Sequence, residues 1–228
     1  AVRRFAEALD IPVVTTFHGK GVMPDDHPLA LGAVGFMRHD YVNFGFDLAD
    51  AIVAVGYELQ EFDPVRINPS RDTKIINIPR FPAELDAHYN VAVGLHADIG
   101  RTLDELTTLV TREHPSSSGH ERIRELLSDE LNRGRADDQF PLAPARIVAD
   151  TRTALRRNDI VLVDTGALKM WMARLYPTYE PNTCLISNGL STMGWSLPGA
   201  IGAKIARPEA KVLVATGDGS FLMNSQEI

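Results

Sequence analysis

The sequence has 228 residues, of which 44% are hydrophobic and 23% are charged, and its 23 basic and 30 acidic side chains give a net charge of −7. This composition is typical of a globular protein with a buried core, which excludes a largely disordered or fibrous chain, and the missing basic excess argues against binding to nucleic acid. A single cysteine, Cys184, excludes an internal disulfide and a cysteine-based zinc site and fits a reducing compartment such as the cytoplasm, and no apolar run reaches the about 18 residues that span a membrane.

The N-terminal half alternates predicted helices with predicted strands. Val2, Phe5, Ala6 and Leu9 have helical spacing. Continuous apolar or β-branched runs predict buried strands of a parallel sheet at 11–16, 51–56 and 74–78. Helical spacing also occurs at 41–48 and 98–109, whereas 85–95 has no regular period. The chain starts inside a predicted helix without an initiator Met and ends in the first turns of another, so we expect it to be a piece of a longer protein.

The polar segment 111–119 has no hydrophobic periodicity and predicts a linker. Because the length fits two modest domains, we expect a central domain at 1–112, a linker at 113–120 and a second domain at 121–228. In the second half, helices are predicted at 122–131, 144–155, 169–176 and 194–206, and strands at 160–163, 183–186 and 211–215. The alternation predicts an α/β fold throughout, as two Rossmann-like domains with mostly parallel sheets.

The loop Gly217-Asp218-Gly219-Ser220 follows the last predicted strand and holds the chemistry that stands out locally. A carboxylate at the carboxyl end of a parallel strand lies where open sheets bind ligands, and the flanking glycines allow a large group to approach the backbone. Asp218 offers the hard oxygen that Mg²⁺ prefers. Ser220 can cap the helix that follows, and the N-terminus of that helix would attract an anion. The alternative is a tight hairpin turn, since Asp-Gly is a common hairpin signal. Residues 221–228 contain helix formers, which favours a metal–diphosphate site slightly.

Three segments in order resemble the acetolactate synthase branch of the thiamine-diphosphate enzymes: 164–171, 187–203 and 217–227. The segment 11–28 is similar to the central domain of these synthases, and 56–64 is similar to their catabolic, FAD-independent members. The resemblance covers nearly the whole chain. It implies a parent of three domains, of which this chain holds most of the central domain and the start of the diphosphate-binding domain.

The resemblance also implies roles for individual residues. Asp218 would bind Mg²⁺, and Met193 would be the apolar wedge that keeps the two rings of the cofactor bent toward each other. Without the motif, Met193 would read as an ordinary gap filler of the core. The implied cofactor-binding residues are Thr165, Gly166, Ala167 and Leu168 in the first loop, Ser191 and Met193 in the second, and Gly217, Gly219 and Ser220 in the third.

The family's remaining site residues lie outside this sequence. Its activating glutamate belongs to an N-terminal domain, usually of the neighbouring subunit, and an Asn-containing segment completes its metal site. The resemblance therefore implies a homodimer or homotetramer, and we expect the fragment alone to be inactive. FAD is possible but disfavoured, because 57–64 lacks the arginines that the FAD-binding branch carries there, although Arg38 could contact an anion.

The implied function is thiamine-diphosphate-dependent decarboxylation of pyruvate and carboligation to a second 2-oxo acid, giving 2-acetolactate, in branched-chain amino acid or acetoin metabolism. One alternative is another thiamine-diphosphate enzyme, such as a 2-oxo acid decarboxylase or a glyoxylate carboligase. A further alternative is a non-catalytic nucleotide- or cofactor-binding module built on the central domain.

Overall fold

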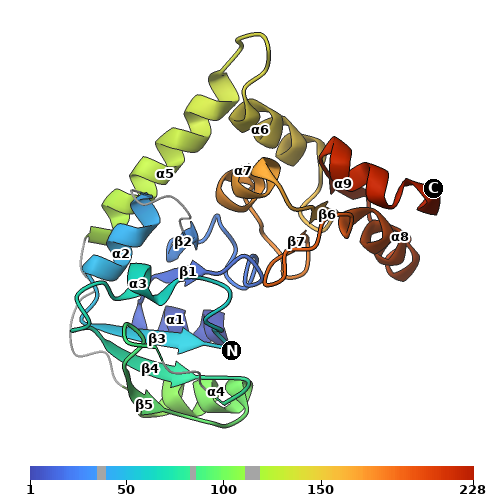
Figure 1. The fold of residues 1–228 in the computed structure, drawn as a ribbon. Helices are drawn as coiled ribbons and strands as arrows, with labels where there is room; N and C mark the ends of the chain where they lie inside the picture. Colours follow the sequence, from blue (N-terminus) through green and yellow to red (C-terminus); the bar gives the residue numbers. More distant parts are fainter. Residues whose placement is uncertain (35–39, 83–85, 111–118) are drawn as a thin grey trace. The chain divides into compact units, whose positions relative to one another are not determined.

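The computed structural model describes residues 1–34, 40–82, 86–110 and 119–228 (Figure 1). These residues form two compact units, one made of Ala1–Thr16 and Pro28–Glu125 and the other of Phe17–His27 and Leu126–Ile228. Residues 113–118 of the expected linker lie outside the described residues, and Gly119 and His120 are the first residues of a helix. The second unit therefore takes a segment of eleven residues from the N-terminal part of the chain.

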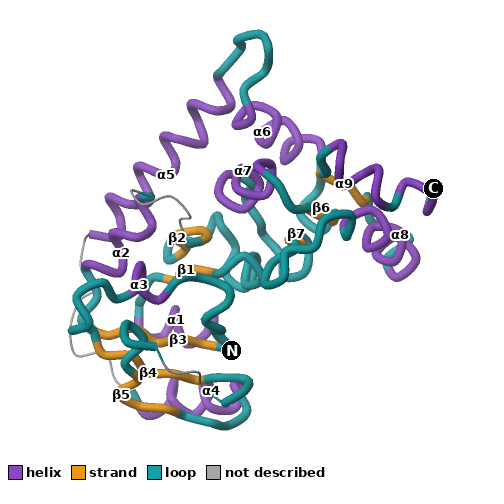
Figure 2. The backbone as a smooth tube through the Cα atoms, viewed as in Figure 1, coloured by secondary structure: helices purple, strands orange, loops and turns teal. Residues whose placement is uncertain are grey.

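The first unit contains two small parallel sheets, one pairing β1 with β2 and one in the order β3-β4-β5 (Figure 2). Its strands are β1 (Val13–Thr15), β2 (Ala30–Ala33), β3 (Ala51–Val55), β4 (Lys74–Ile78) and β5 (Val91–Gly94). Its helices are α1 (Val2–Leu9), the 3₁₀ turn η1 (Tyr41–Asn43), α2 (Phe44–Asp47), α3 (Pro64–Ile67) and α4 (Ile99–Leu109).

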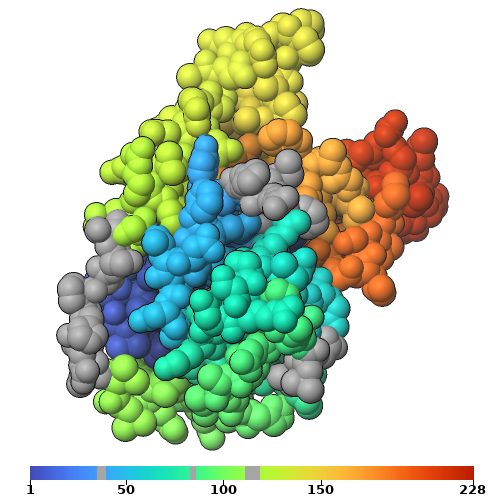
Figure 3. All heavy atoms as spheres, turned by 60° about the vertical axis from the view of Figure 1, so that its left-hand side comes forward, coloured from blue at the N-terminus to red at the C-terminus, as the bar shows by residue number. Residues whose placement is uncertain are grey.

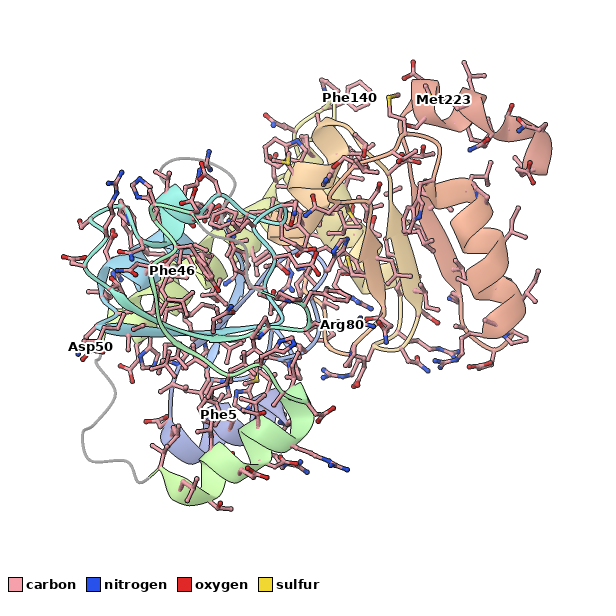
Figure 4. The ribbon with its side chains drawn as sticks, turned by 60° about the horizontal axis from the view of Figure 1, so that its bottom comes forward. Phe5, Phe46, Asp50, Arg80, Phe140 and Met223 are labelled. Carbon is pink, nitrogen blue, oxygen red and sulfur yellow. The ribbon has the colours of Figure 1, made fainter. Side chains whose placement is uncertain are left out.

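Helices α1 and α4 cover one face of the three-stranded sheet and lie side by side (Figure 4). Phe5 of α1, Leu103 of α4 and Ile78 of β4 form the buried centre of this contact. In the space-filling view, the segment between β3 and β4 covers part of the visible face of the first unit (Figure 3). The apolar stripes predicted for both helices thus face the sheet, as burial of apolar area requires.

The second unit has a parallel sheet in the order β7-β6-β8, with β6 in the centre. Its strands are β6 (Ile160–Val163), β7 (Cys184–Ile186) and β8 (Val212–Ala215), and its helices are α6 (Pro144–Ala154), α7 (Ala167–Leu175), α8 (Ser196–Ala206), α9 (Asp218–Met223) and the 3₁₀ turn η2 (Ser225–Glu227). The long helix α5 (Gly119–Ala136) contributes residues to both units. The expected α/β fold with parallel sheets is confirmed.

Some elements differ from their predicted extent. Strands β2 and β5 were not predicted, and 41–48 forms a 3₁₀ turn followed by a four-residue helix in place of one helix. Helix α8 begins at Ser196, because Gly194 has a φ of +77°, outside the helical region. Within the described part of the chain, no helix is both long and apolar enough to cross a membrane.

Candidate functional site

Three loops leave the second unit's sheet at one edge. Val163 of β6 is in register with Ile186 of β7 and with Ala215 of β8, so all three parallel strands end at the same level. After β6 the chain forms β7 on one side and then returns to the other side of β6 for β8. Such a reversal of strand order marks the edge at which open α/β sheets bind ligands. The three segments predicted as cofactor loops are those that start there.

Asp164, the first residue after β6, holds the first two loops together. Its carboxylate is fully buried; one oxygen accepts from the backbone N–H groups of Thr165 (2.8 Å) and Gly194 (3.1 Å). The other accepts from the backbone N–H (3.1 Å) and the hydroxyl (2.6 Å) of Ser196. Burial alone would raise the pKa of Asp164, but these donors outweigh it and hold the pKa below its ordinary value. Sequence reasoning gave this residue no role, since its partners Gly194 and Ser196 lie 30 and 32 positions away.

The first loop passes from Asp164 into α7. The hydroxyl of Thr165 donates to the backbone carbonyl of Ser191 in the second loop (2.8 Å). Gly166 has a φ of +137°, a conformation that other residues rarely adopt, and Ala167 is the first residue of α7. The Leu168 side chain lies about 4 Å from where a side chain on Gly217 would begin, which brings the first loop against the third.

The second loop, 187–195, has a strained backbone held by partners outside it. Gly189, Ser191 and Gly194 all have positive φ values, and only Ser191 is not a glycine. The Lys169 ammonium on α7 donates to the Asn188 side-chain carbonyl (2.8 Å) and to the Ser191 hydroxyl (2.9 Å). Lys169 was not singled out from the sequence, where it reads as an ordinary helical lysine.

Met193 lies between the second and third loops. Its methyl carbon is 3.6 Å from where a side chain on Gly219 would begin, and 42% of the residue is exposed. A methionine that only fills a gap in the core would be buried. Met193 instead leaves apolar surface open between the two loops. Nearby, Met223 at the end of α9 is labelled in Figure 4 and is 55% exposed.

The third loop leads directly into helix α9, so the hairpin alternative is wrong. The helix begins at Asp218, so the expected capping role of Ser220 is wrong as well. Asp218 is exposed, and one carboxylate oxygen accepts from the backbone N–H of Gly219 (2.9 Å). Ser220 is buried, whereas Gly219 is exposed and leaves its backbone open to an approaching group. Among the described residues, no three His, Cys, Asp or Glu side chains cluster around a common metal position. Carboxylate oxygens are ligands that Mg²⁺ commonly shares with a diphosphate, and the exposed side chain of Asp218 has this chemistry.

Matches to known proteins cover most of the chain. Residues 1–106 match the family described as "Thiamine pyrophosphate enzyme, central domain", and residues 164–228 match "Thiamine pyrophosphate enzyme, C-terminal TPP binding domain". The chain belongs to the thiamine pyrophosphate enzymes. The second match starts at Asp164 and includes all three loops, so the family expected from the loop motifs is confirmed.

Relatives of this thiamine pyrophosphate enzyme match along nearly its whole length. A "Probable acetolactate synthase large subunit" of Methanocaldococcus jannaschii is 38% identical over 234 residues, which cover 99% of this chain and 39% of that protein. The "Acetolactate synthase isozyme 1 large subunit" of Escherichia coli is 33% identical, with 100% and 40% covered, and the "Acetolactate synthase" of Bacillus subtilis is 31% identical, with 100% and 41% covered. The chain thus spans about two fifths of the length of these relatives.

In the first unit, the segment after β3 folds back on itself. The Tyr57 hydroxyl donates to the backbone carbonyl of Phe62, and the Tyr57 and Tyr89 rings lie 5.3 Å apart. Phe62 is buried in a core cluster, and burial raises the pKa of both tyrosine hydroxyls. Tyr57 thus connects the segment after β3 to Phe62 and packs against Tyr89 of the same unit. Arg38, the residue that kept FAD possible, lies outside the described residues.

Proposed function

We propose that this chain is part of a thiamine-diphosphate- and Mg²⁺-dependent acetolactate synthase. The observation that carries the proposal is the convergence of three loops at the reversal point of the β7-β6-β8 sheet, with the exposed carboxylate of Asp218 at one of them. The relatives named acetolactate synthase support the choice of reaction. When bound, thiamine diphosphate supplies an electron sink for the loss of the carboxylate of a 2-oxo acid.

Each of the three loops holds a different part of the cofactor in the proposed enzyme. Asp218 holds Mg²⁺, and the exposed backbone of Gly219 leaves room for the diphosphate. Met193 would support the rings of the cofactor, because its methyl group lies next to Gly219 and 42% of the residue is exposed. The residues proposed to line the diphosphate and the rest of the cofactor are Thr165, Gly166, Ala167, Leu168, Ser191, Gly217 and Ser220.

The whole protein completes the site. We propose that 1–112 and 121–228 belong to the central and diphosphate-binding domains of a cytoplasmic homodimer or homotetramer, with pyruvate as the 2-oxo acid donor. The activating carboxylic acid belongs to a domain outside this chain. FAD stays disfavoured, because 57–64 carries no arginine that could pair with its diphosphate.

The test uses the full-length protein with pyruvate, thiamine diphosphate and Mg²⁺, without added FAD, and measures acetolactate and acetaldehyde together. We expect acetolactate, and we expect Asp218→Ala to weaken Mg²⁺-dependent cofactor binding by at least about 10- to 100-fold, since even residues that only support a metal ligand have effects of this size. Asp129→Ala is the matched control, because Asp129 is an exposed carboxylate on α5. Acetaldehyde as the only product would make the protein a decarboxylase, and unchanged cofactor affinity in Asp218→Ala would overturn the metal assignment.

A further inference from the structure

Helix α7 carries a buried lysine whose ammonium group reaches the second loop. Lys169 is only 7% exposed, and its ammonium donates to one side chain near each end of the strained turn, Asn188 (2.8 Å) and Ser191 (2.9 Å). Burying a charged group is costly unless its hydrogen bonds are satisfied. The two hydrogen bonds offset that cost, and they tie the loop to a rigid helix.

The second loop needs such a tie. Ser191 has a φ of +49°, in the left-handed region, which costs an ordinary residue about 1–2 kcal/mol. Two of its polar groups are held from the first loop and α7: its carbonyl accepts from the Thr165 hydroxyl (2.8 Å) and its hydroxyl accepts from Lys169 (2.9 Å). Two residues further along, Met193 faces the third loop. The position of Met193 therefore depends on how Ser191 is held.

Lys169 is itself supported by the segment Phe17–His27, which belongs to the same compact unit. The Lys169 ammonium lies over the Phe17 ring, 5.7 Å from its centre, and Phe17 is buried. A cation at this distance from an aromatic face is attracted to it. Lys169 and Ala173 are four residues apart and thus share one face of α7, the face that this segment contacts.

The rest of Phe17–His27 is fixed to the same face and to the chain that follows α7. The carbonyl of Ala173 would normally accept from the N–H four residues later, but that residue is Pro177, which has none. The buried ammonium of Lys20 donates to this carbonyl instead (3.1 Å) and lies 3.7 Å from Asp25.

Two further contacts fix the far end of the segment. Asp25 and Thr178 exchange two hydrogen bonds: the backbone N–H of Asp25 donates to the Thr178 carbonyl (2.9 Å), and that of Thr178 to the Asp25 carboxylate (2.7 Å). Gly21 packs so closely on Glu180 that a side-chain carbon would come within 2.3 Å of the Glu180 carbonyl oxygen. The segment is thus a well-fixed support for the face of α7 that carries Lys169.

We propose that Lys169 is a positioning residue for the second cofactor loop, and that Phe17–His27 is the clasp that holds Lys169 in place. The inference rests on the proposed function, since it concerns the same site. In this proposal, neither Lys169 nor Phe17 contacts the reacting atoms. Lys169 acts through Ser191 and Asn188 on the position of Met193, and Phe17 acts through Lys169.

The test measures hydrogen–deuterium exchange of the full-length protein without cofactor. We expect Lys169→Met to raise the exchange rate of amides in 187–195 by at least about tenfold, the factor expected for the loss of one hydrogen bond from a charged donor. Phe17→Leu should raise it about two- to tenfold, because it removes the aromatic face but keeps an apolar side chain. Lys211→Met is the matched control, since the Lys211 side chain is exposed in the same unit. Unchanged exchange in Lys169→Met would overturn the inference.

Two additional measurements guard against a trivial result. Should Lys169→Met fail to fold, Ser191→Ala removes the acceptor and leaves the lysine bonded to Asn188; it should loosen 187–195 without loosening 17–27. In the folded variants, effects of Lys169→Met and Ser191→Ala on thiamine diphosphate affinity should be less than additive, because both break the same hydrogen bond; full additivity would contradict the inference. Exchange without cofactor is independent of the proposed function, which fails separately if Asp218→Ala leaves cofactor affinity unchanged.

Discussion

At the scale of single residues, Asp164 shows how one buried carboxylate orders two loops. It accepts four hydrogen bonds, which come from Thr165, Gly194 and Ser196. Because all four donors point at the carboxylate, an amide in its place would direct its own N–H group at another donor. The loop geometry therefore depends on the charge of Asp164 as well as on its shape.

Asp164→Asn should lower the free energy of unfolding by about 1–3 kcal/mol at pH 7, the usual cost of a buried group that loses its partner. The folded-state pKa of Asp164 lies below the ordinary 3.8, so its carboxylate stabilises the fold above that pH, and the effect is lost as the pH falls through the folded-state pKa. The difference between wild type and variant should be constant from about pH 5 to 8 and shrink below about pH 4. Urea unfolding across this range measures it, with Asp129→Asn as the exposed control; a difference that grows in acid would contradict the assignment.

Gly194 is a second residue whose identity the structure explains. Its φ of +77° disfavours any side chain, and a side-chain carbon would lie 2.9 Å from the Asn224 amide nitrogen and 3.1 Å from the Met223 side chain. Asn224 in turn donates to the Gly194 carbonyl (2.7 Å), so the second loop and the end of α9 meet at this glycine.

Gly194→Ala should therefore destabilise the protein by at least about 2 kcal/mol, through backbone strain and the displaced Asn224. Gly202→Ala is the control: Gly202 lies within α8, no neighbouring atom comes within 4 Å of where its side-chain carbon would lie, and alanine there should gain about 0.5–1 kcal/mol. Midpoints of thermal unfolding of the cofactor-free protein compare the two. Equal midpoints would show that Gly194 tolerates a side chain.

At the scale of elements, the side-chain cap of a helix is a local interaction whose contribution to stability can be measured separately. Helix α4 starts at Ile99, and the carboxylate of Asp98 caps it by accepting from the backbone N–H of Arg101 (2.9 Å). Capping satisfies one of the N–H groups that lack a partner in the first turn. Helix α1 has no such side-chain cap, so it depends on its packing against α4 and the sheet.

Asp98→Ala should cost about 1 kcal/mol of stability, and Asp98→Ser should recover most of it because serine is also a good cap. Glu105→Ala on the same helix should change stability by less than about 0.5 kcal/mol, since its side chain is exposed. Urea unfolding of the three variants measures these differences. A loss in Asp98→Ser as large as that in Asp98→Ala would show that the cap is not the cause.

Elements with a continuous apolar run were predictable, whereas elements defined by their partners were not. Strands β3, β4, β6 and β8 are mainly apolar runs rich in Val and Ile, and each was expected near its observed place, although only β6 is buried throughout. Strand β2 (Ala30–Ala33) contains no β-branched residue and β5 (Val91–Gly94) is largely exposed, so neither carries a strong local signal. Both become strands because a neighbouring strand pairs with them.

At the scale of the whole molecule, the two compact units allow the cofactor to be located without any activity. With saturating thiamine diphosphate and Mg²⁺, we expect amide exchange to slow mainly in 164–168, 187–195 and 216–220. Ligand at about one hundred times its dissociation constant should add about 2.7 kcal/mol to the stability of the unit that binds it. Protection confined to β3, β4 and β5 would instead favour a nucleotide-binding role of the first unit.

Each loop motif lies in one short stretch of sequence and could be recognised locally, and the structure starts all three loops at one edge of the sheet. The contacts that hold the loops were not predictable in the same way. Lys20 and Ala173 are 153 positions apart, and no local pattern relates them. The orphaned carbonyl before Pro177 was a possible signal, but it does not say which residue supplies the donor.

The origin of Phe17–His27 has a consequence for how such proteins can recombine. Consider a hybrid protein that takes the chain before 111–118 from one parent and the chain after it from another. Its second unit would then combine Phe17–His27 of the first parent with α7 of the second. Exchanging the unit as a whole requires three crossovers, on either side of Phe17–His27 and before Leu126. Natural or engineered shuffling at the single boundary suggested by composition would therefore place Gly21 of one parent against the residue at position 180 of another.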